Sequence, residues 1–253
     1  MNEKRAISVV ILAAGQGKRM NNPDLPKVLT ELGNTPLISY VIKLSQKLDA
    51  KQIVAIIGHK KELVEKYLSD EFPSVEYAYQ LMQLGTGHAV MQAAPNLEGF
   101  NGDVLILCGD VPLLREKTLE NFIAKHQESN SDLSVLTSIS ESPTGYGRIV
   151  RNADKVFYKI TEEKDASDEV KQIKEINSGI FLVNSKLLFD ALGKISNKNA
   201  QGEYYLTDIV EVFVNENRKC SGFAGVSFDE MQGINSPEDL LRAEKYYYSY
   251  YQK

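Results

Sequence analysis

The sequence has no tryptophan, only two cysteines, and no long hydrophobic run. Cys108 and Cys220 are too few for a disulfide framework, so we expect reduced thiols. No stretch approaches the roughly 18 apolar residues of a membrane span, and residues 1–6 are polar, unlike a secretory signal. These absences exclude a disulfide-rich secreted scaffold and predict a cytoplasmic protein that makes no use of a membrane.

The chain also lacks a strong charge bias. Its formal net charge is −5, with 43% hydrophobic and 25% charged residues, which is ordinary for a globular protein. This balance argues against a nucleic-acid surface, which would show a basic stripe, but local lysines and arginines could still bind an anionic substrate. The 253 residues show no internal repeat, linker or domain boundary, so we expect one domain over residues 1–253.

Histidines are scarce as well. His59, His88 and His126 are scattered along the chain and do not have the spacing of a zinc site. His88 follows Gly87, and we expect it to serve in packing or at a helix end. The sequence therefore offers no histidine-based catalytic or metal site.

The most informative stretch is residues 7–27, ISVVILAAGQGKRMNNPDLPK. Its apolar run over residues 7–14 is typical of a fully buried strand. The strand leads directly into Gly15 and Gly17, whose backbone N–H groups could approach phosphate oxygens closely. Arg19 and Lys27 add positive charge that can neutralise a polyphosphate.

Two common phosphate-binding motifs do not fit this stretch. The dinucleotide fingerprint needs a third small residue where Met20 stands. The P-loop needs a Ser or Thr after Gly-Lys, where Arg19 stands, and an earlier Gly, where Ala13 stands. From these residues alone, a plain strand-to-helix turn with incidental basic side chains remains an alternative.

Along the first half of the chain, buried strands alternate with helical patterns. This rhythm predicts parallel β-α-β units with a right-handed crossover, in which ligands lie beyond the carboxyl ends of the strands. Gly15, Gln80 and Gly109 fall at such ends. The predicted strands are residues 52–57, 75–80, 103–108 and 133–137, and the predicted helices are residues 35–49, 60–68, 86–94 and 116–129.

The second half has a different rhythm. Residues 148–151 and 156–160 indicate a β-hairpin, and the polar residues 161–174 indicate a solvated excursion. Further strands are predicted at residues 176–183 and 220–226, and helices at residues 185–192, 204–217 and from residue 236 to the end. The run of tyrosines over residues 246–251 leaves two interpretations open: a helix packed on one face, or a contact surface for a partner.

Several motifs resemble those of a known family. They are LAAGQGKRM over residues 12–20, LPKVL over 25–29, QLGTGHA over 83–89, GDVP over 109–112, TGYGRI over 144–149, EINSG over 175–179 and NAQGEYY over 199–205. Together, and in this order, they resemble the uridyltransferase domains of the bifunctional enzymes that make UDP-N-acetylglucosamine, within the sugar-phosphate nucleotidyltransferase family. The resemblance implies an α/β, Rossmann-like nucleotidyltransferase fold. It has a mixed, mainly parallel central sheet and a small β-rich sugar-binding lobe.

The resemblance also assigns roles to individual residues. Asp110, directly after a buried strand, and Asn235, before Ser-Pro, would hold Mg²⁺, a hard ion that prefers oxygen ligands. Either residue could instead simply form a turn. The implied catalytic residues are Arg19, Lys27 and Asp110. The nucleotide would be bound by Leu12, Ala13, Ala14, Gly15, Lys27, Gln80, Gly85, Thr86, Cys108, Gly109 and Asp110, and the sugar by Gly147, Glu162, Asn177 and Asn235.

Two details put individual assignments in doubt. Cys108 stands where relatives often have tyrosine, which questions a side-chain contact there but not a backbone role. Glu163 could take the place of Glu162 if the polar stretch aligns one residue further along.

The implied reaction joins UTP to N-acetylglucosamine 1-phosphate and releases pyrophosphate. The attacking phosphate is already ionised, so catalysis needs positioning and charge neutralisation rather than a general base. The rival hypotheses are the same chemistry on another sugar phosphate or nucleotide, and a non-catalytic nucleotide-sugar sensor. The resembling enzymes continue into a β-helical domain of hexapeptide repeats that carries an acetyltransferase activity. Since this sequence contains no such repeats, we expect it to lack that second activity. Its oligomeric state stays open.

Overall fold

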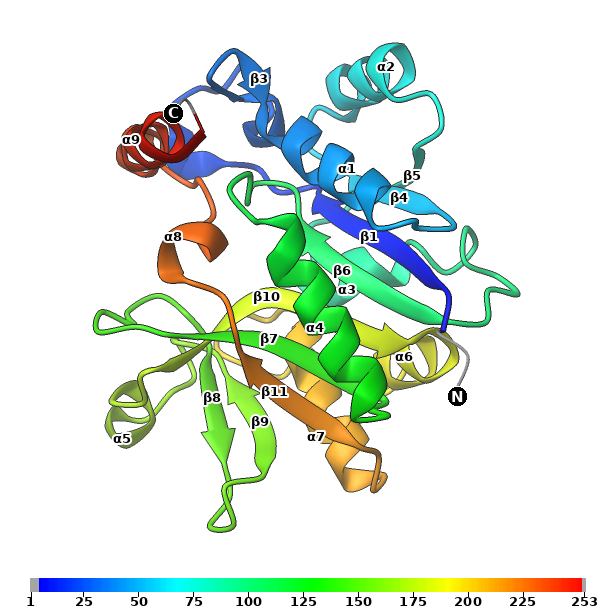
Figure 1. Cartoon of the computed structure of the whole chain (residues 1–253), viewed down its shortest axis with the longest axis vertical. Helices are drawn as coiled ribbons and strands as arrows, with labels where there is room; N and C mark the ends of the chain where they lie inside the picture. Colours follow the sequence, from blue (N-terminus) through cyan, green and yellow to red (C-terminus); the bar gives the residue numbers. More distant parts are fainter. Residues whose placement is uncertain (1–4, 252–253) are drawn as a thin grey trace.

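The apolar run near the N-terminus forms the central strand β1 (Ile7–Ala13), and its side chains alternate between two cores. Val9 and Ile11 lie in one apolar cluster, and Val10 lies in a second cluster on the other face of the sheet. A strand covered on both faces needs apolar side chains at nearly every position, which explains the continuous run. The computed structural model, which describes residues 5–251, is built outward from this strand (Figure 1).

Strand β1 belongs to a nine-stranded sheet whose main path has the order β11-β7-β10-β6-β1-β4-β5. β1 pairs in parallel with β4 and β6, β4 with β5, and β7 with β11, whereas β10 runs antiparallel between β6 and β7. The predicted mixed, mainly parallel sheet is therefore confirmed. The remaining strands are β4 (Ile53–Ile57), β5 (Glu76–Tyr79), β6 (Asp103–Cys108), β7 (Leu133–Ile139), β8 (Arg148–Arg151), β9 (Phe157–Thr161), β10 (Glu175–Asn184) and β11 (Cys220–Ala224).

Helices cover both faces of this sheet (Figure 1). Apolar residues of α1 (Leu37–Lys47), α2 (Lys61–Glu71) and α4 (Glu116–Glu128) pack in the cluster that contains Val9. Those of α3 (Thr86–Met91), α6 (Ser185–Leu192) and α7 (Ile209–Asn215) pack in the cluster that contains Val10. Of the helices in residues 5–251, none combines the length and the apolar character needed to cross a bilayer.

The predicted hairpin is formed by β8 and β9, and it continues the sheet through a pairing of β8 with β10. Two ion pairs hold this lobe together: Arg148 with Glu163 at 2.7 Å, and Arg151 with Glu175 at 2.7 Å. The polar segment after the hairpin contains a short helix, α5 (Asp168–Lys171), which begins with the Ser167 side chain accepting from the Val170 N–H. The lobe is thus an extension of the central sheet.

The last helix, α9 (Pro237–Tyr251), packs against the small hairpin of β2 (Glu31–Leu32) and β3 (Thr35–Pro36). The Tyr247 ring lies edge-on to Tyr40, with ring centroids 5.9 Å apart, and it fills the space beside Gly33. Tyr248 remains 47% exposed. The helix therefore packs on the domain with one face, in agreement with the first of the two interpretations. The side chains of residues 250 and 251 lie outside the part of the chain that the structure describes.

Two predicted helices were wrong at their starts. Residues 35 and 36 form strand β3 rather than the beginning of α1, and the helix expected from residue 204 begins later. Residues 204 and 205 are not helical, and the chain turns first into η3 (Leu206–Asp208) and then into α7. The cause is tertiary: Tyr204 donates its N–H to the Leu84 carbonyl at 2.7 Å and accepts from Gly87 at 2.8 Å. Backbone groups committed to another segment cannot take part in a helix. The sequence pattern also missed the short helix α8 (Phe228–Met231).

Candidate active site

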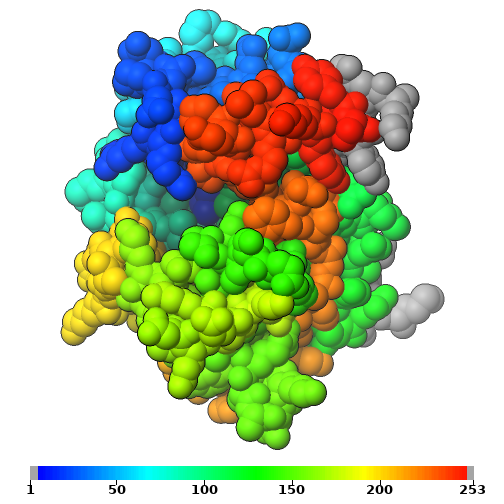
Figure 2. Space-filling model, turned by 90° about the vertical axis from the view of Figure 1, so that its left-hand side faces the viewer, coloured from blue at the N-terminus to red at the C-terminus, as the bar shows by residue number. Residues whose placement is uncertain are grey.

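A cavity of about 260 Å³ opens at the carboxyl ends of β1, β5 and β6. Registers across β1 bring Leu12 beside Cys108 and Ala13 beside Ile57, so these strand ends share one edge of the sheet. Figure 2 shows this side of the molecule, with a hollow between the C-terminal segment above and the green lobe below. The predicted gathering of Gly15, Gln80 and Gly109 at this edge is confirmed.

Most residues that the sequence assigned to a nucleotide line this cavity. They are Leu12, Ala13, Ala14, Gly15, Lys27, Gln80, Gly85, Thr86, Cys108 and Asp110. Gly109 does not line the cavity, but it contacts a residue that does: its N–H donates to the Leu12 carbonyl at 2.9 Å. The structure thus brings the set together, and its role in nucleotide binding stays a prediction.

The glycine loop is shaped to let Lys27 approach the cavity. Gly17 has φ of 61°, a left-handed conformation, and a Cβ atom there would lie 2.7 Å from the Lys27 Cβ. A larger residue at this position would be strained and would collide with the Lys27 side chain. Gly15 has open space around it, which leaves its backbone free for a ligand to approach.

Lys27 lies between the two predicted metal ligands, Asp110 and Asn235. Its Nζ donates to Asn235 Oδ1 at 2.9 Å and forms a very short contact with Asp110 Oδ2. The side chains of Lys27 and Asp110 are only 13% and 14% exposed, so this ion pair is weakly screened. Three residues from distant parts of the chain therefore form one polar cluster at the rim of the cavity.

Asn235 is held in place by the start of α9. Its N–H donates to Asp239 Oδ2 at 3.1 Å, and its own side-chain amide donates to the Gly233 carbonyl at 3.1 Å. Ser236 caps the helix by accepting from the Asp239 N–H at 3.2 Å. These bonds leave Asn235 Oδ1 directed at Lys27.

Arg19 differs from Lys27 in its surroundings. It lies exposed on the short helix η1 (Lys18–Met20) and does not line the cavity. Its charge nevertheless acts near the site, because the pKa of Tyr146, raised mainly by burial, is lowered in part by Arg19 and Arg242. Arg19 thus lies outside the cavity, and its role in catalysis stays a prediction.

Three residues that the resemblance assigns to the nucleotide, Gln80, Gly85 and Thr86, form hydrogen bonds within the protein. The Gln80 side-chain amide donates to the Gly85 carbonyl at 2.9 Å, and Gln80 is 4% exposed. Thr86 Oγ1 accepts from the Leu206 N–H at 3.0 Å, which joins α3 to η3. This end of the cavity is therefore rigidly built before any ligand arrives.

Three of the four residues predicted to contact the sugar also meet, whereas the fourth, Asn235, lies beside Lys27 instead. Asn177 donates its N–H to the Gly147 carbonyl at 2.9 Å, and a Cβ on Gly147 would lie 3.4 Å from Glu162 Oε2. Burial raises the pKa of Glu162, and Asp165 and Glu203 raise it further, while a hydrogen bond from Thr207 at 2.9 Å lowers it. Asn177 Oδ1 accepts from the Gly179 N–H at 2.9 Å, across an irregularity in β10.

Glu163, the alternative to Glu162, is committed elsewhere. It accepts from Arg148 at 2.7 Å and from the Gly145 N–H at 3.2 Å. Those two contacts lower its pKa, whereas burial acts to raise it. Glu162, beside Gly147, is the carboxylate that faces the predicted sugar residues.

Cys108 contributes a small apolar surface rather than a reactive group. Burial raises the pKa of its thiol to about 12, with a smaller contribution from Asp110. A thiol that stays protonated is a poor nucleophile. Its Sγ lies 3.9 Å from the Gly179 carbonyl oxygen, at the boundary between the predicted nucleotide and sugar ends.

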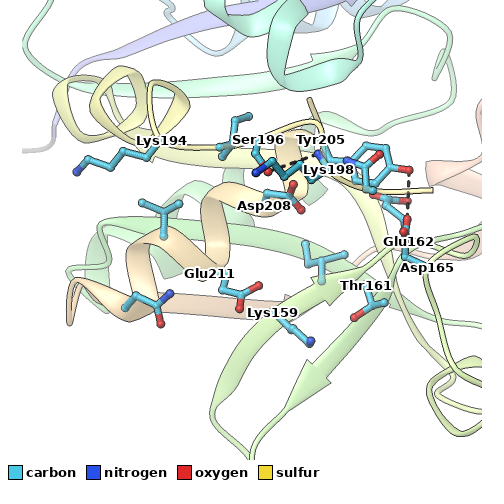
Figure 3. Close-up of a pocket in the computed structure, with 15 residues that line it drawn as sticks. Lys159, Thr161, Glu162, Asp165, Lys194, Ser196, Lys198, Tyr205, Asp208 and Glu211 are labelled. Atoms are coloured by element: carbon cyan, nitrogen blue, oxygen red, sulfur yellow. Dashed lines mark hydrogen bonds between the residues drawn. The ribbon is translucent and has the colours of Figure 1, made fainter. Parts of the chain in front are cut away.

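A second cavity, of about 400 Å³, lies on the side of Glu162 toward α7 (Figure 3). Its wall carries the carboxylates of Asp165, Asp208 and Glu211, and Tyr205 donates to Asp165 at 3.2 Å. Burial raises the pKa of Asp208 to about 6, and the neighbouring carboxylates add to the shift, Glu162 first. This wall therefore changes its charge near neutral pH.

The sequence analysis missed four residues that line the first cavity, at the carboxyl ends of β1, β5 and β6: Val28, Gln83, Ala89 and Glu203. All four lie inside motifs that had been recognised, at positions to which no role had been assigned. Within residues 5–251, no group of three or more His, Cys, Asp or Glu side chains is arranged to hold a metal ion. A divalent ion here would depend on Asp110, Asn235 and oxygen atoms of a ligand.

Comparison with known proteins gives a consistent result. Residues 8–228 match the family model described as nucleotidyl transferase. The chain is 47% identical over 236 residues to the bifunctional protein GlmU of Caldanaerobacter subterraneus subsp. tengcongensis, and 44% identical over 236 residues to that of Geobacillus thermodenitrificans. Each alignment covers 93% of this chain and 50% of the relative, so the chain spans about half the length of these relatives.

Among solved structures, the chain is similar to UDP-glucose pyrophosphorylase in complex with UDP-glucose. The TM-score is 0.76 with 18% sequence identity, and the match covers 96% of this chain and 99% of the other. At this identity the likeness concerns the fold, which it supports over nearly the whole length.

Proposed function

The chain belongs to the nucleotidyl transferase family, and we propose that it transfers the uridylyl group of UTP to N-acetylglucosamine 1-phosphate, giving UDP-N-acetylglucosamine and pyrophosphate. The proposal rests on 41–47% identity to relatives named GlmU, and on the matching motifs of this sequence. Because the chain spans half of those relatives, the proposal is limited to this one reaction.

The single observation that carries the proposal is the position of the cluster of Lys27, Asp110 and Asn235. Lys27 and Asp110 line the cavity together with the glycine loop. Cys108 lines the same cavity and lies 3.9 Å from the carbonyl oxygen of Gly179, on the strand that carries the predicted sugar residue Asn177. In a uridylyl transfer, the α-phosphate must meet the sugar phosphate between a nucleotide and a sugar. A cation-bearing cluster at that junction is the arrangement this chemistry needs.

In the proposed reaction, a phosphate oxygen of the sugar phosphate attacks the α-phosphorus of UTP, and the bond to pyrophosphate breaks. The attacking oxygen is already ionised, so no side chain has to remove a proton. Lys27 would move from Asp110 to the triphosphate. Arg19 would approach the triphosphate from outside the cavity. Their positive charges would stabilise the negative charge of the transition state.

The residues fit a bound Mg²⁺. Asp110 Oδ2 and Asn235 Oδ1 already converge on one cation, the Lys27 ammonium, and both are hard oxygen donors. Bound there, Mg²⁺ would neutralise phosphate charge and hold substrate oxygens in position. The role of this chain is to present the two oxygens and to release Lys27 when the triphosphate enters.

The test is an assay of pyrophosphate release over a panel of triphosphates and sugar 1-phosphates. We expect the highest kcat/KM for UTP with N-acetylglucosamine 1-phosphate, and no release without a divalent ion. Higher activity with glucose 1-phosphate or another nucleotide would favour related chemistry on a different substrate. Binding of UDP-N-acetylglucosamine with no turnover of any pair would favour the nucleotide-sugar sensor.

A further inference from the structure

His88 contacts the side chain of Gln80, one of the residues assigned to the nucleotide. It lies on α3, half-buried, with its Nδ1 3.1 Å from the side-chain nitrogen of Gln80. The same nitrogen donates to the Gly85 carbonyl at 2.9 Å. The sequence analysis had assigned His88 only to packing or a helix end, and the contact gives it a partner in the site.

The Gly85 carbonyl decides which way the Gln80 amide faces. A carbonyl oxygen can only accept, so the Gln80 atom beside it must be the NH₂ group. The carbonyl itself is fixed by α3, because it also accepts from the Ala89 N–H at 3.1 Å. The amide therefore cannot turn over without bringing two carbonyl oxygens together.

The second hydrogen of that NH₂ group points to His88. Nδ1 of the ring must then accept, and the ring proton lies on Nε2. Nε2 is 3.4 Å from the Gln92 amide nitrogen, which donates to the His88 carbonyl at 2.9 Å. These two N–H groups make no hydrogen bond with each other, because the shorter contact of 3.1 Å at Nδ1 takes the one acceptor of the ring. Gln80 thus donates both of its side-chain N–H groups within the protein, to the Gly85 carbonyl and to His88. Its Oε1 has no hydrogen-bond partner among residues 5–251.

We propose that His88 is a positioning residue: by accepting from Gln80, it keeps the Gln80 carbonyl oxygen available to the N3–H of a pyrimidine base and so selects uracil over cytosine. This rests on the proposed function, in which UTP occupies the cavity. Uracil carries a hydrogen on N3, which an acceptor satisfies. Cytosine carries a lone pair there, which an acceptor repels.

Loss of the His88 acceptor should affect the base more than the phosphates. One amide hydrogen of the 4%-exposed Gln80 would be left without its partner, and the amide would be held by the Gly85 carbonyl alone. Turning over would then be opposed by one contact in place of two. The expected consequence is a smaller difference between the affinities for UTP and CTP.

The test measures Kd for UTP and for CTP by titration calorimetry with Mg²⁺ and no sugar phosphate, so it is independent of sugar choice. The variants are His88→Leu, which removes the acceptor, and His88→Asn, whose side-chain oxygen can replace Nδ1. His59→Leu is the matched control, because His59 makes no side-chain hydrogen bond to Gln80. If leucine is not accommodated, His88→Ala reports the same quantity.

The wild-type protein should prefer UTP by about 100-fold or more. His88→Leu should reduce that ratio about tenfold, while His88→Asn and His59→Leu stay within about threefold of the wild type. A wild-type preference for UTP that His88→Leu and His88→Ala both retain would overturn the role of His88 alone. No wild-type preference between UTP and CTP would overturn the proposed uridylyl specificity together with it.

Discussion

The Lys27 ammonium is bound to Asp110 and lies 2.9 Å from Asn235 Oδ1, so a side-chain cation sits between the two predicted metal ligands. This arrangement satisfies a carboxylate that would otherwise be buried without a partner. In the proposed reaction, one position would serve two cations in turn. A divalent ion would take both oxygens once Lys27 has moved to the triphosphate.

This relationship predicts different consequences for the two cations of the glycine loop. Lys27→Ala should lower kcat by about 100-fold or more, because it removes a charge held inside the site. Arg19→Ala should cost less and depend more on salt, because Arg19 is exposed. The measurement is kcat and KM for both variants at low and high ionic strength, with the exposed Lys18→Ala as the control. Equal losses for Lys27→Ala and Lys18→Ala would contradict the prediction.

Asp110→Asn should abolish most activity while leaving the fold intact. The change keeps the shape of the side chain but removes the negative charge that a divalent ion requires. Pyrophosphate release should fall by about 100-fold or more at ordinary Mg²⁺ concentrations, with the melting temperature close to that of the wild type. Near-normal turnover by this variant would rule out Asp110 as the metal ligand.

Asn177→Ala should change sugar choice more than UTP affinity. A site that hydrogen-bonds a substrate group penalises substrates that lack it, because its own polar groups are left unpaired. We expect the wild type to prefer N-acetylglucosamine 1-phosphate over glucosamine 1-phosphate and glucose 1-phosphate, each missing hydrogen bond costing about 1–3 kcal/mol. Values of kcat/KM for the three sugars should converge in the variant. Equal values already in the wild type would point to a broader sugar specificity.

Asp208→Asn should stabilise the protein at neutral pH and not at acidic pH. The pKa of Asp208 is raised to about 6 by burial and by neighbouring carboxylates, above its ordinary value of 3.8. The folded state thus holds this proton more tightly than the unfolded state, and its stability falls as pH rises between these two values. Asparagine removes that penalty, which we expect to be about 1–2 kcal/mol at pH 7.5 after solvent screening.

Urea unfolding of both proteins at pH 4 and pH 7.5 measures this difference. The variant and the wild type should have similar unfolding free energies at pH 4, where Asp208 is largely protonated in the folded state. Glu211→Gln provides a comparison on the same cavity wall. A stabilisation by Asp208→Asn that is equal at both pH values would contradict the assignment.

The parts of the fold that could be predicted are those set by local chemistry. β6, α6 and the first strand of the hairpin lie at the expected residues, because apolar runs and turn residues define them. The start of α7 could not be predicted, since the backbone of Tyr204 is bound to Leu84 and Gly87, more than a hundred residues earlier. A local pattern contains no information about such a pairing.

The site shows the same division. Its residues could be named from motifs, but their contacts could not, because Lys27 and Asn235 are separated by 208 positions in the sequence. His88 was undervalued for this reason: its spacing suggested no metal site, and its role depends on the orientation of Gln80, which only the Gly85 carbonyl reveals. The motif supplied the residue types, and the hydrogen bonds between them came from the folded chain.

The antiparallel direction of β10 has a consequence for how such a protein can diversify. Because β10 enters the sheet at the edge where β6 ends, the chain from Ile139 to Glu175 leaves and returns at the same place. The lobe on this excursion carries its own ion pairs, and it is anchored to the rest of the chain in two ways. Its Ile149, Phe157 and Ile160 lie in the apolar cluster that contains α7, and Thr207, Tyr205 and the Ala200 N–H form hydrogen bonds to its carboxylates. Substitutions within residues 139–207 could therefore change the surroundings of Gly147, Glu162 and Asn177 while leaving β1, the glycine loop and Lys27 unchanged. A new acceptor specificity could arise in this way by changes in one continuous part of the gene.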